Sequence, residues 1–213
     1  MMFASREDAG ARLGRCLQEQ RVRADLVLGL PRGGVIVAAG VARALHLPLD
    51  ALVVRKIGHP WHREFAVGAL AEPDVVMIDE ATLVEVPVLR GQLDKVVAEE
   101  IARLREYCSQ FHGSASPALR DKSVLLVDDG LATGATAEAA VLSAKRQGAR
   151  RVTMAAPVAS TGAAERLRRV ADEVVVLVVD PGFEAVGQYY DEFFQTSDEA
   201  VIALLHAAAL RRE

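Results

Sequence analysis

Two adjacent carboxylates stand at the point where an apolar run gives way to small residues. Val124 to Val127 is fully apolar, Asp128 and Asp129 follow it, and glycine, alanine and threonine then lead into a helical pattern. A helix start presents free N–H groups and the positive end of its dipole, so this segment suits a phosphate. The carboxylates would repel a bare anion, but they can accept hydrogen bonds from sugar hydroxyls beside a metal cation. These residue types in this order predict a site for a phosphorylated sugar.

The whole string from Val124 to Thr136, VLLVDDGLATGAT, resembles the phosphoribosyl-pyrophosphate signature of type I phosphoribosyltransferases. An ordinary capped helix after a buried strand is the alternative interpretation of the same residues. In that family the acidic pair holds the ribose 2′ and 3′ hydroxyls, and the loop after it cradles the 5′-phosphate. The resemblance therefore implies that Asp128 and Asp129 bind ribose. It also implies a phosphate loop formed by Ala132, Thr133, Gly134, Ala135 and Thr136.

A second segment, GLPRGG, follows the first apolar strand and opens a helix. It is similar to the pyrophosphate loop of the family, where a basic or polar residue precedes paired glycines. Glycines allow the backbone to approach an anion closely, and an arginine can donate two parallel hydrogen bonds. The resemblance implies pyrophosphate binding by Arg32, Gly33 and Gly34. In relatives the peptide before the basic residue can be cis, which predicts a cis bond between Pro31 and Arg32.

Arg55 and Lys56 end the next strand-like run and resemble a pair that meets pyrophosphate in adenine-type members. Alone, two basic residues at a strand end are typical of a solvated edge. The three segments follow different strands of a parallel arrangement, so the fold can bring them to one cleft. The resemblance thus gives Arg55 and Lys56 a catalytic role together with the acidic pair.

Short apolar runs alternate with helical patterns, which indicates a parallel twisted sheet with helices on both faces and an α/β fold. The chain has 213 residues, of which 51% are hydrophobic, enough for one buried domain over residues 1–213. A small hairpin at residues 66–78 and a helical insertion at about 79–117 depart from the alternation. The expected strands cover residues 24–30, 49–57, 66–71, 75–78, 124–127, 152–156 and 173–179. The expected helices cover residues 5–20, 35–45, 88–111, 162–170, a segment ending at 147 and the C-terminal region.

Residues 58–65 read as a loop, at the position of the mobile lid of many family members. The lid candidates are His59, His62, Arg63 and Glu64. His59 and His62 have a spacing that metal ligands use, but no third ligand is near them in sequence, which favours a solvated loop.

The last strand is followed by Asp180 and Phe183, which are candidates for contact with a planar acceptor; packing is an equal alternative for Phe183. Members acting on 6-oxopurines usually carry aspartate where this chain has Ala132, so the resemblance argues against a hypoxanthine-guanine enzyme.

The net charge of −4 and the pI near 5.8 argue against nucleic-acid and membrane-surface binding. Cys16 and Cys108 are far apart and form no C-x-x-C pair, so we expect neither a disulfide framework nor a metal site. The absence of an apolar signal segment predicts a cytoplasmic protein, and a homodimer is left open.

The resemblance implies a pentosyltransferase of nucleotide metabolism and salvage. It would transfer ribose-5-phosphate from phosphoribosyl pyrophosphate to a nitrogenous base or similar acceptor and release pyrophosphate. Magnesium would be held mainly by substrate and water near Asp128 and Asp129. A non-catalytic regulator that binds the same ligand is the main alternative, and a nucleotide hydrolase is a further one.

Overall fold

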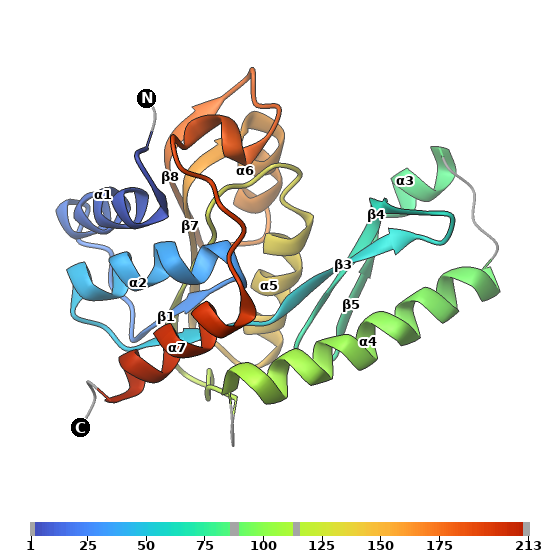
Figure 1. Ribbon diagram of the computed structural model, residues 1–213, viewed down its shortest axis with the longest axis horizontal. Helices are drawn as coiled ribbons and strands as arrows, with labels where there is room; N and C mark the ends of the chain where they lie inside the picture. Colours follow the sequence, from blue (N-terminus) through green and yellow to red (C-terminus); the bar gives the residue numbers. More distant parts are fainter. Residues whose placement is uncertain (1–2, 86–89, 113–115, 211–213) are drawn as a thin grey trace.

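The computed structural model describes residues 3–85, 90–112 and 116–210. At its centre is a five-stranded sheet with the order β2–β1–β6–β7–β8, in which every neighbouring pair is parallel (Figure 1). The adjacent interior strands β1 and β6 are buried along their whole length, in keeping with sequences that are almost entirely apolar. The strands span Leu49–Ala51, Leu26–Gly29, Ser123–Val127, Arg151–Ser160 and Glu173–Asp180 in that order.

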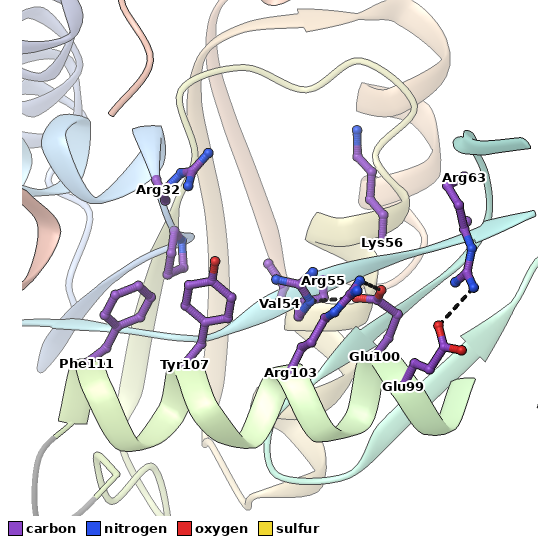
Figure 2. A pocket seen from close by; sticks show the side chains of 12 residues that line it. Arg32, Val54, Arg55, Lys56, Arg63, Glu99, Glu100, Arg103, Tyr107 and Phe111 are labelled. Atoms are coloured by element: carbon purple, nitrogen blue, oxygen red, sulfur yellow. Dashed lines mark hydrogen bonds and ion pairs between the residues drawn. The ribbon is translucent and has the colours of Figure 1, made fainter. Parts of the chain in front are cut away.

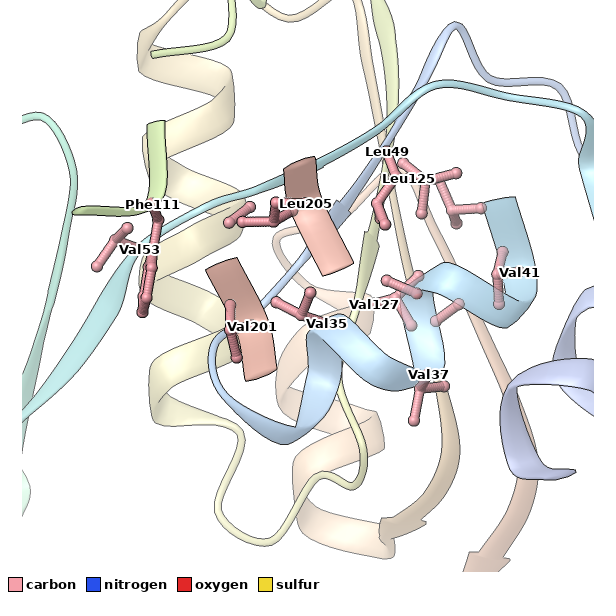
Figure 3. Close-up of a cluster of buried hydrophobic side chains, with 14 of the residues drawn as sticks. Val35, Val37, Val41, Leu49, Val53, Phe111, Leu125, Val127, Val201 and Leu205 are labelled. Carbon is pink, nitrogen blue, oxygen red and sulfur yellow. The ribbon is translucent and has the colours of Figure 1, made fainter. Parts of the chain in front are cut away.

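Helices cover both faces of this sheet, which confirms the predicted α/β class. One face carries α1 (Arg6–Glu19), α2 (Gly33–Leu45) and α7 (Asp198–Ala209), and the other carries α5 (Ala135–Arg146) and α6 (Thr161–Arg168) (Figure 1). Each face has its own apolar core, and Figure 3 shows the one between the sheet, α2 and α7.

A second, antiparallel sheet of three strands extends from the first. It contains β3 (Val54–His59), β4 (His62–Ala71) and β5 (Val75–Ile78). The long helix α4 (Arg90–His112) and the helix α5 both contact these strands. The short helices are α3 (Glu80–Glu85) and the 3-10 helix η1 (Val186–Tyr189). The predicted hairpin of β4 and β5 is confirmed. For the long helix predicted from residue 88, residues 88 and 89 lie outside the described part of the chain.

Two of the predicted elements are wrong. The run 49–57 is divided, because β2 belongs to the large sheet and β3 to the small one. Leu52 and Val53, which connect the two strands, are fully buried. The apolar sequence pattern therefore continues through the connection and gives no signal that the chain changes sheet.

The predicted loop at residues 58–65 is instead the closed end of the β3–β4 hairpin, where His59 pairs with His62. Only Pro60 and Trp61 form the turn. Gly58 lies at an irregularity of the pairing, and a side chain there would overlap the backbone of Arg63. No described helix combines the length and apolar character needed to cross a membrane.

Candidate active site

The strand order reverses direction between β1 and β6. From β1 the chain passes through α2 to β2 on one side, whereas β6, β7 and β8 follow one another on the other side. The loops after β1 and β6 therefore leave adjacent strands and diverge, which opens a crevice where ligands bind in parallel α/β sheets. The first loop contains Pro31 and Arg32, and the second contains the acidic pair.

The two glycines that follow the first loop, at the start of α2, let the backbone contact the acidic pair directly. A Cβ atom on Gly33 would overlap the Asp129 carboxylate, and one on Gly34 would lie 2.9 Å from the Asp128 Cα. Only a hydrogen in place of a side chain allows this approach. The peptide bond between Pro31 and Arg32 is cis, as predicted. Two segments about a hundred residues apart are thus brought together at the crevice.

The two carboxylates have different surroundings. Asp128 accepts a hydrogen bond from the Asp129 backbone N–H at 2.9 Å. Burial and the neighbouring Asp129 carboxylate raise the pKa of Asp128 well above its usual range, although Lys56 partly offsets them. Asp128 is therefore poised to gain from a ligand that donates hydrogen bonds or brings positive charge.

Asp129 is paired with Arg6, a residue of the first helix. The Arg6 Nε donates to Asp129 Oδ2 at 2.7 Å, and its Nη1 donates to the Phe194 carbonyl, also at 2.7 Å. The guanidinium also lies 3.9 Å from the centre of the Phe193 ring. The Tyr190 hydroxyl donates to the Asp129 carbonyl at 2.6 Å. Asp129 is therefore fixed by residues from both ends of the chain.

The predicted phosphate loop is held on the end of β7. Leu131 donates its N–H to the Val158 carbonyl and accepts from Ser160 N–H, both at 2.9 Å. The Ser160 hydroxyl donates to the Ala132 carbonyl at 2.6 Å. Gly134 has φ +76°, a left-handed conformation that favours glycine, and α5 begins directly after it. The small residues from Ala132 to Thr136 thus form a helix start, the arrangement that binds phosphate in many proteins.

A cleft of about 740 Å³ lies beside the first loop. Arg32, Arg55, Lys56 and Arg63 all line it, so the structure brings four of the predicted basic residues together (Figure 2). Arg55 and Lys56 are consecutive in β3 and leave opposite faces of the strand. Arg55 leans toward α4, whereas Lys56 extends away from it (Figure 2). The positive charge of Lys56 acts on Asp128 and lowers the pKa of that carboxyl. The two basic side chains therefore lie on different sides of the crevice.

The opposite wall of the cleft comes from α4, which sequence reasoning did not include in the site. Glu100, which is almost fully buried, accepts from Arg55 Nε at 2.7 Å and from Arg103 Nη1 at 2.6 Å. The Arg55 guanidinium also lies 5.0 Å from the centre of the Tyr107 ring. These residues recur at three- and four-residue spacing, the helical period that points side chains the same way, as Figure 2 shows. That period is the one signal that could have singled them out.

The lid candidates lie on the β3–β4 hairpin, where the His59 and His62 rings stack with their centres 5.7 Å apart. Arg63 pairs with Glu99 of α4 at 2.8 Å, and His62 is exposed. His59 is 1% exposed, so the solvated-loop interpretation is wrong for it; its Nδ1 accepts from the Trp61 N–H at 3.2 Å. Glu64 is part of β4, but its side chain lies outside the described part of the structure.

The candidate acceptor residues lie at the end of β8. Asp180 accepts from the Tyr189 hydroxyl and from the Gly182 N–H, both at 2.7 Å. Phe183 stacks on Tyr189, with ring centres 5.4 Å apart. Both residues therefore have a packing role, and their contact with an acceptor stays a prediction.

Comparison with known proteins identifies the chain. A model of the family described as "Phosphoribosyl transferase domain" matches residues 6–192. Two curated proteins from Mycobacterium tuberculosis strains, CDC 1551 and H37Rv, are each named "Putative phosphoribosyl transferase" and are 40% identical over 208 residues. The match covers 97% of this chain but only 47% of theirs, so the chain spans about half of their length.

A crystal structure of a Thermus thermophilus protein is 42% identical in sequence. It superposes with a TM-score of 0.79 over 96% of this chain and 98% of the other. The chain therefore belongs to the phosphoribosyl transferase domain family and has the type I phosphoribosyltransferase fold.

Proposed function

We propose that the chain transfers ribose-5-phosphate from phosphoribosyl pyrophosphate to a nitrogenous base or similar acceptor and releases pyrophosphate. The observation that carries the proposal is the contact between the Gly33–Gly34 backbone and the Asp128–Asp129 pair at the reversal of strand order. A sugar bound there can reach a helix start for its 5′-phosphate and a basic cleft for its pyrophosphate. Phosphoribosyl pyrophosphate carries the matching groups in the same order.

Each subsite has its own residues in the proposal. The 5′-phosphate accepts hydrogen bonds from the loop of Ala132 to Thr136 at the start of α5. The ribose hydroxyls donate to Asp128 and Asp129. The pyrophosphate lies against Arg32, Arg55 and Lys56, which line the cleft beside the loop after β1.

The reaction breaks the bond between ribose C1 and the pyrophosphate oxygen, which leaves with the electron pair. A ring nitrogen of the acceptor then forms the new bond to C1 and releases its proton to solvent. Positive charge develops on the sugar and negative charge on the leaving group, so the site contributes mainly positioning and electrostatic stabilisation. Carboxylates beneath the sugar and arginines around the pyrophosphate match these two charges.

Magnesium fits this donor set. Burial and the neighbouring Asp129 raise the pKa of Asp128, and Asp129 is already paired with Arg6. The two carboxylates therefore do not form a complete set of ligands for a cation. This incomplete set suits a cation held mostly by phosphate oxygens and water, as magnesium usually is at phosphate sites. When bound, magnesium neutralises part of the charge on the pyrophosphate. Asp128 would face its water shell or the ribose hydroxyls.

Calorimetry with phosphoribosyl pyrophosphate and magnesium tests the binding step. We expect binding to the wild-type chain and its loss in the double variant Asp128→Asn/Asp129→Asn. Asp74→Asn, which changes an exposed carboxylate in the turn between β4 and β5, is the control and should bind as the wild type does. Equal affinity in all three proteins would refute the assigned ribose site.

Turnover with labelled phosphoribosyl pyrophosphate and a panel of bases tests the transfer. Release of pyrophosphate that depends on one base, with formation of the matching nucleotide, is the expected result. Tight binding with no turnover on any base would favour the regulatory alternative. Loss of base from added nucleotides would favour a hydrolase.

A further inference from the structure

Three side chains with metal-binding donor atoms converge away from the proposed sugar site. Glu72 lies in the turn between β4 and β5, and Cys108 and His112 lie one helical turn apart on α4. One donor atom from each residue lies within 4.8 Å of the other two. Residues four apart on a helix share a face, which is why the thiol and the imidazole both reach Glu72. Sequence reasoning missed this cluster because Glu72 is 36 and 40 residues away from the other two.

The atoms of the cluster already make the short contacts of a compact site. His112 Nε2 lies 2.9 Å from both carboxylate oxygens of Glu72, and Cys108 Sγ lies 3.3 Å from Glu72 Oε2. The Ser116 hydroxyl is also 3.3 Å from Glu72 Oε2. The imidazole is 2% exposed and the carboxylate 5%. The imidazole and the carboxylate are therefore shielded from competing water, whereas Cys108 is only partly buried.

A second layer of contacts orients these donors. His112 Nδ1 lies 3.3 Å from Asp50 Oδ1, so the ring can give its Nδ1 hydrogen to a carboxylate and direct Nε2 at the cluster. Metal-bound histidines usually have such a partner, which fixes the tautomer and makes the ligand more basic. Glu72 Oε1 accepts the Val53 N–H at 2.7 Å, which fixes the carboxylate in turn.

We propose that Glu72, Cys108 and His112 bind a zinc ion, with water or the Ser116 hydroxyl as the fourth ligand. Thiolate, imidazole and carboxylate together are ligands that zinc accepts in four-coordinate sites, whereas magnesium and calcium bind oxygen ligands. The ion would join α4 to the turn between β4 and β5. The ion would have a structural role, separate from the proposed transfer reaction.

Zinc has to displace protons from this cluster before Cys108 and His112 can act as ligands. Burial and Glu72 raise the pKa of the Cys108 thiol to about 12, so the metal-free thiol is protonated. Burial opposes a charged His112, but hydrogen bonds to Asp50 and Glu72 prevail and raise its pKa to about 9. Zinc binding therefore releases one proton from Sγ and one from Nε2. Two positive charges leave and two arrive, so the net charge of the buried cluster does not change.

Zinc at this place would fix the wall of the cleft. Phe111 precedes His112, and Tyr107 precedes Cys108, and both aromatic residues line the cleft. Holding the end of α4 on the β4–β5 turn would keep these rings, and Glu100 two turns earlier, in position opposite β3.

Metal analysis and cobalt substitution test the proposal on the full chain. Protein grown with added zinc should contain one zinc ion per chain. After removal of metal with a chelator, added cobalt should produce the charge-transfer absorption of a cobalt–thiolate bond. Cys108→Ser should lose this band and His112→Gln should lose the zinc, whereas Cys16→Ser, which changes the other cysteine, should keep both. Circular dichroism of each variant would confirm that it folds.

The wild-type measurement is decisive even if a variant does not fold. Absence of both zinc and the cobalt–thiolate band in folded wild-type protein would overturn the proposal and leave the cluster as a hydrogen-bonded ion pair. A band that persists in folded Cys108→Ser would overturn it equally, because the thiolate would then belong to another site.

Discussion

Replacing Arg6 with methionine tests how strongly the two ends of the chain fix the acidic pair. Methionine keeps much of the length of the side chain but removes the charge. The Asp129 carboxylate loses its ion pair at 2.7 Å, and the Phe194 carbonyl loses a donor at the same distance. The Arg6 and Asp129 side chains are only 10% and 15% exposed, so water cannot fully replace the lost partner.

Removing one partner of a buried ion pair costs about 3–5 kcal/mol. The partial exposure places Arg6→Met at the lower end, about 3 kcal/mol including the bond to the Phe194 carbonyl. For a chain of this size each kcal/mol lowers the melting temperature by roughly 2–4 °C, so a decrease of about 10 °C is expected. Urea denaturation followed by circular dichroism measures the free energy of unfolding.

Arg12→Met is the matched control on the same helix. Arg12 pairs with Asp8 at 2.9 Å, but these side chains are 34% and 28% exposed. Exposed pairs contribute about 0–1 kcal/mol, so this variant should change the free energy of unfolding little. The double variant Arg6→Met/Asp129→Leu should regain part of the lost stability. If Arg6→Met and Arg12→Met cost the same, the buried pair does not have the importance assigned to it.

Three further variants probe the crevice. Asp128→Asn should raise the free energy of unfolding at pH 7 and weaken the binding of phosphoribosyl pyrophosphate. The folded state raises the pKa of Asp128, so the ionised carboxylate destabilises the fold at any pH above its unfolded pKa. The uncharged amide removes that destabilisation. Lower stability in urea denaturation at pH 7 would contradict this. Glu100→Ala should increase the affinity for pyrophosphate several-fold and steepen its salt dependence, because Arg55 and Arg103 lose their carboxylate. Calorimetry at two salt concentrations measures this, and an unchanged affinity would argue against a pyrophosphate site at Arg55. Gly33→Ala should abolish phosphoribosyl-pyrophosphate binding with the fold retained, since its Cβ overlaps Asp129, whereas Gly91→Ala has open space and should bind normally. Normal binding by Gly33→Ala would show that the crevice adapts.

The parts of the fold that could be predicted from sequence are those with a local signal. The alternation of apolar strands and helices indicated the parallel sheet, and Ser5 caps α1 by accepting from the Asp8 N–H. The change of sheet between Ala51 and Val54 has no such signal, since both sheets accept the same apolar residues. The sequence predicts a loop at the hairpin end because glycine and proline, here Gly58 and Pro60, usually interrupt strands. Here the glycine allows an irregular pairing and the proline lies in the turn.

The site shows the same division. The motif residues after β1, within β3 and after β6 could be predicted because each motif is continuous in sequence. Arg6, Glu100 and the Glu72–Cys108–His112 cluster were missed as functional residues, since their partners lie 123, 45 and 36–40 residues away. The one-domain organisation and the roles of the individual site residues stay predictions.

The buried connection between β2 and β3, formed by Leu52 and Val53, limits where the chain can accept insertions. Leu52 packs in the core on one face of the large sheet, and Val53 packs in the core on the other. An added residue just after Val53 would shift β3 by one position, and since side chains alternate along a strand, Arg55 and Lys56 would exchange faces. The arginine would leave Glu100, and the lysine would turn away from Asp128. Insertions should therefore be tolerated at the exposed hairpin tip around Trp61. They should not be tolerated between β2 and β3, because the length of that connection determines the face of β3 on which each basic side chain lies.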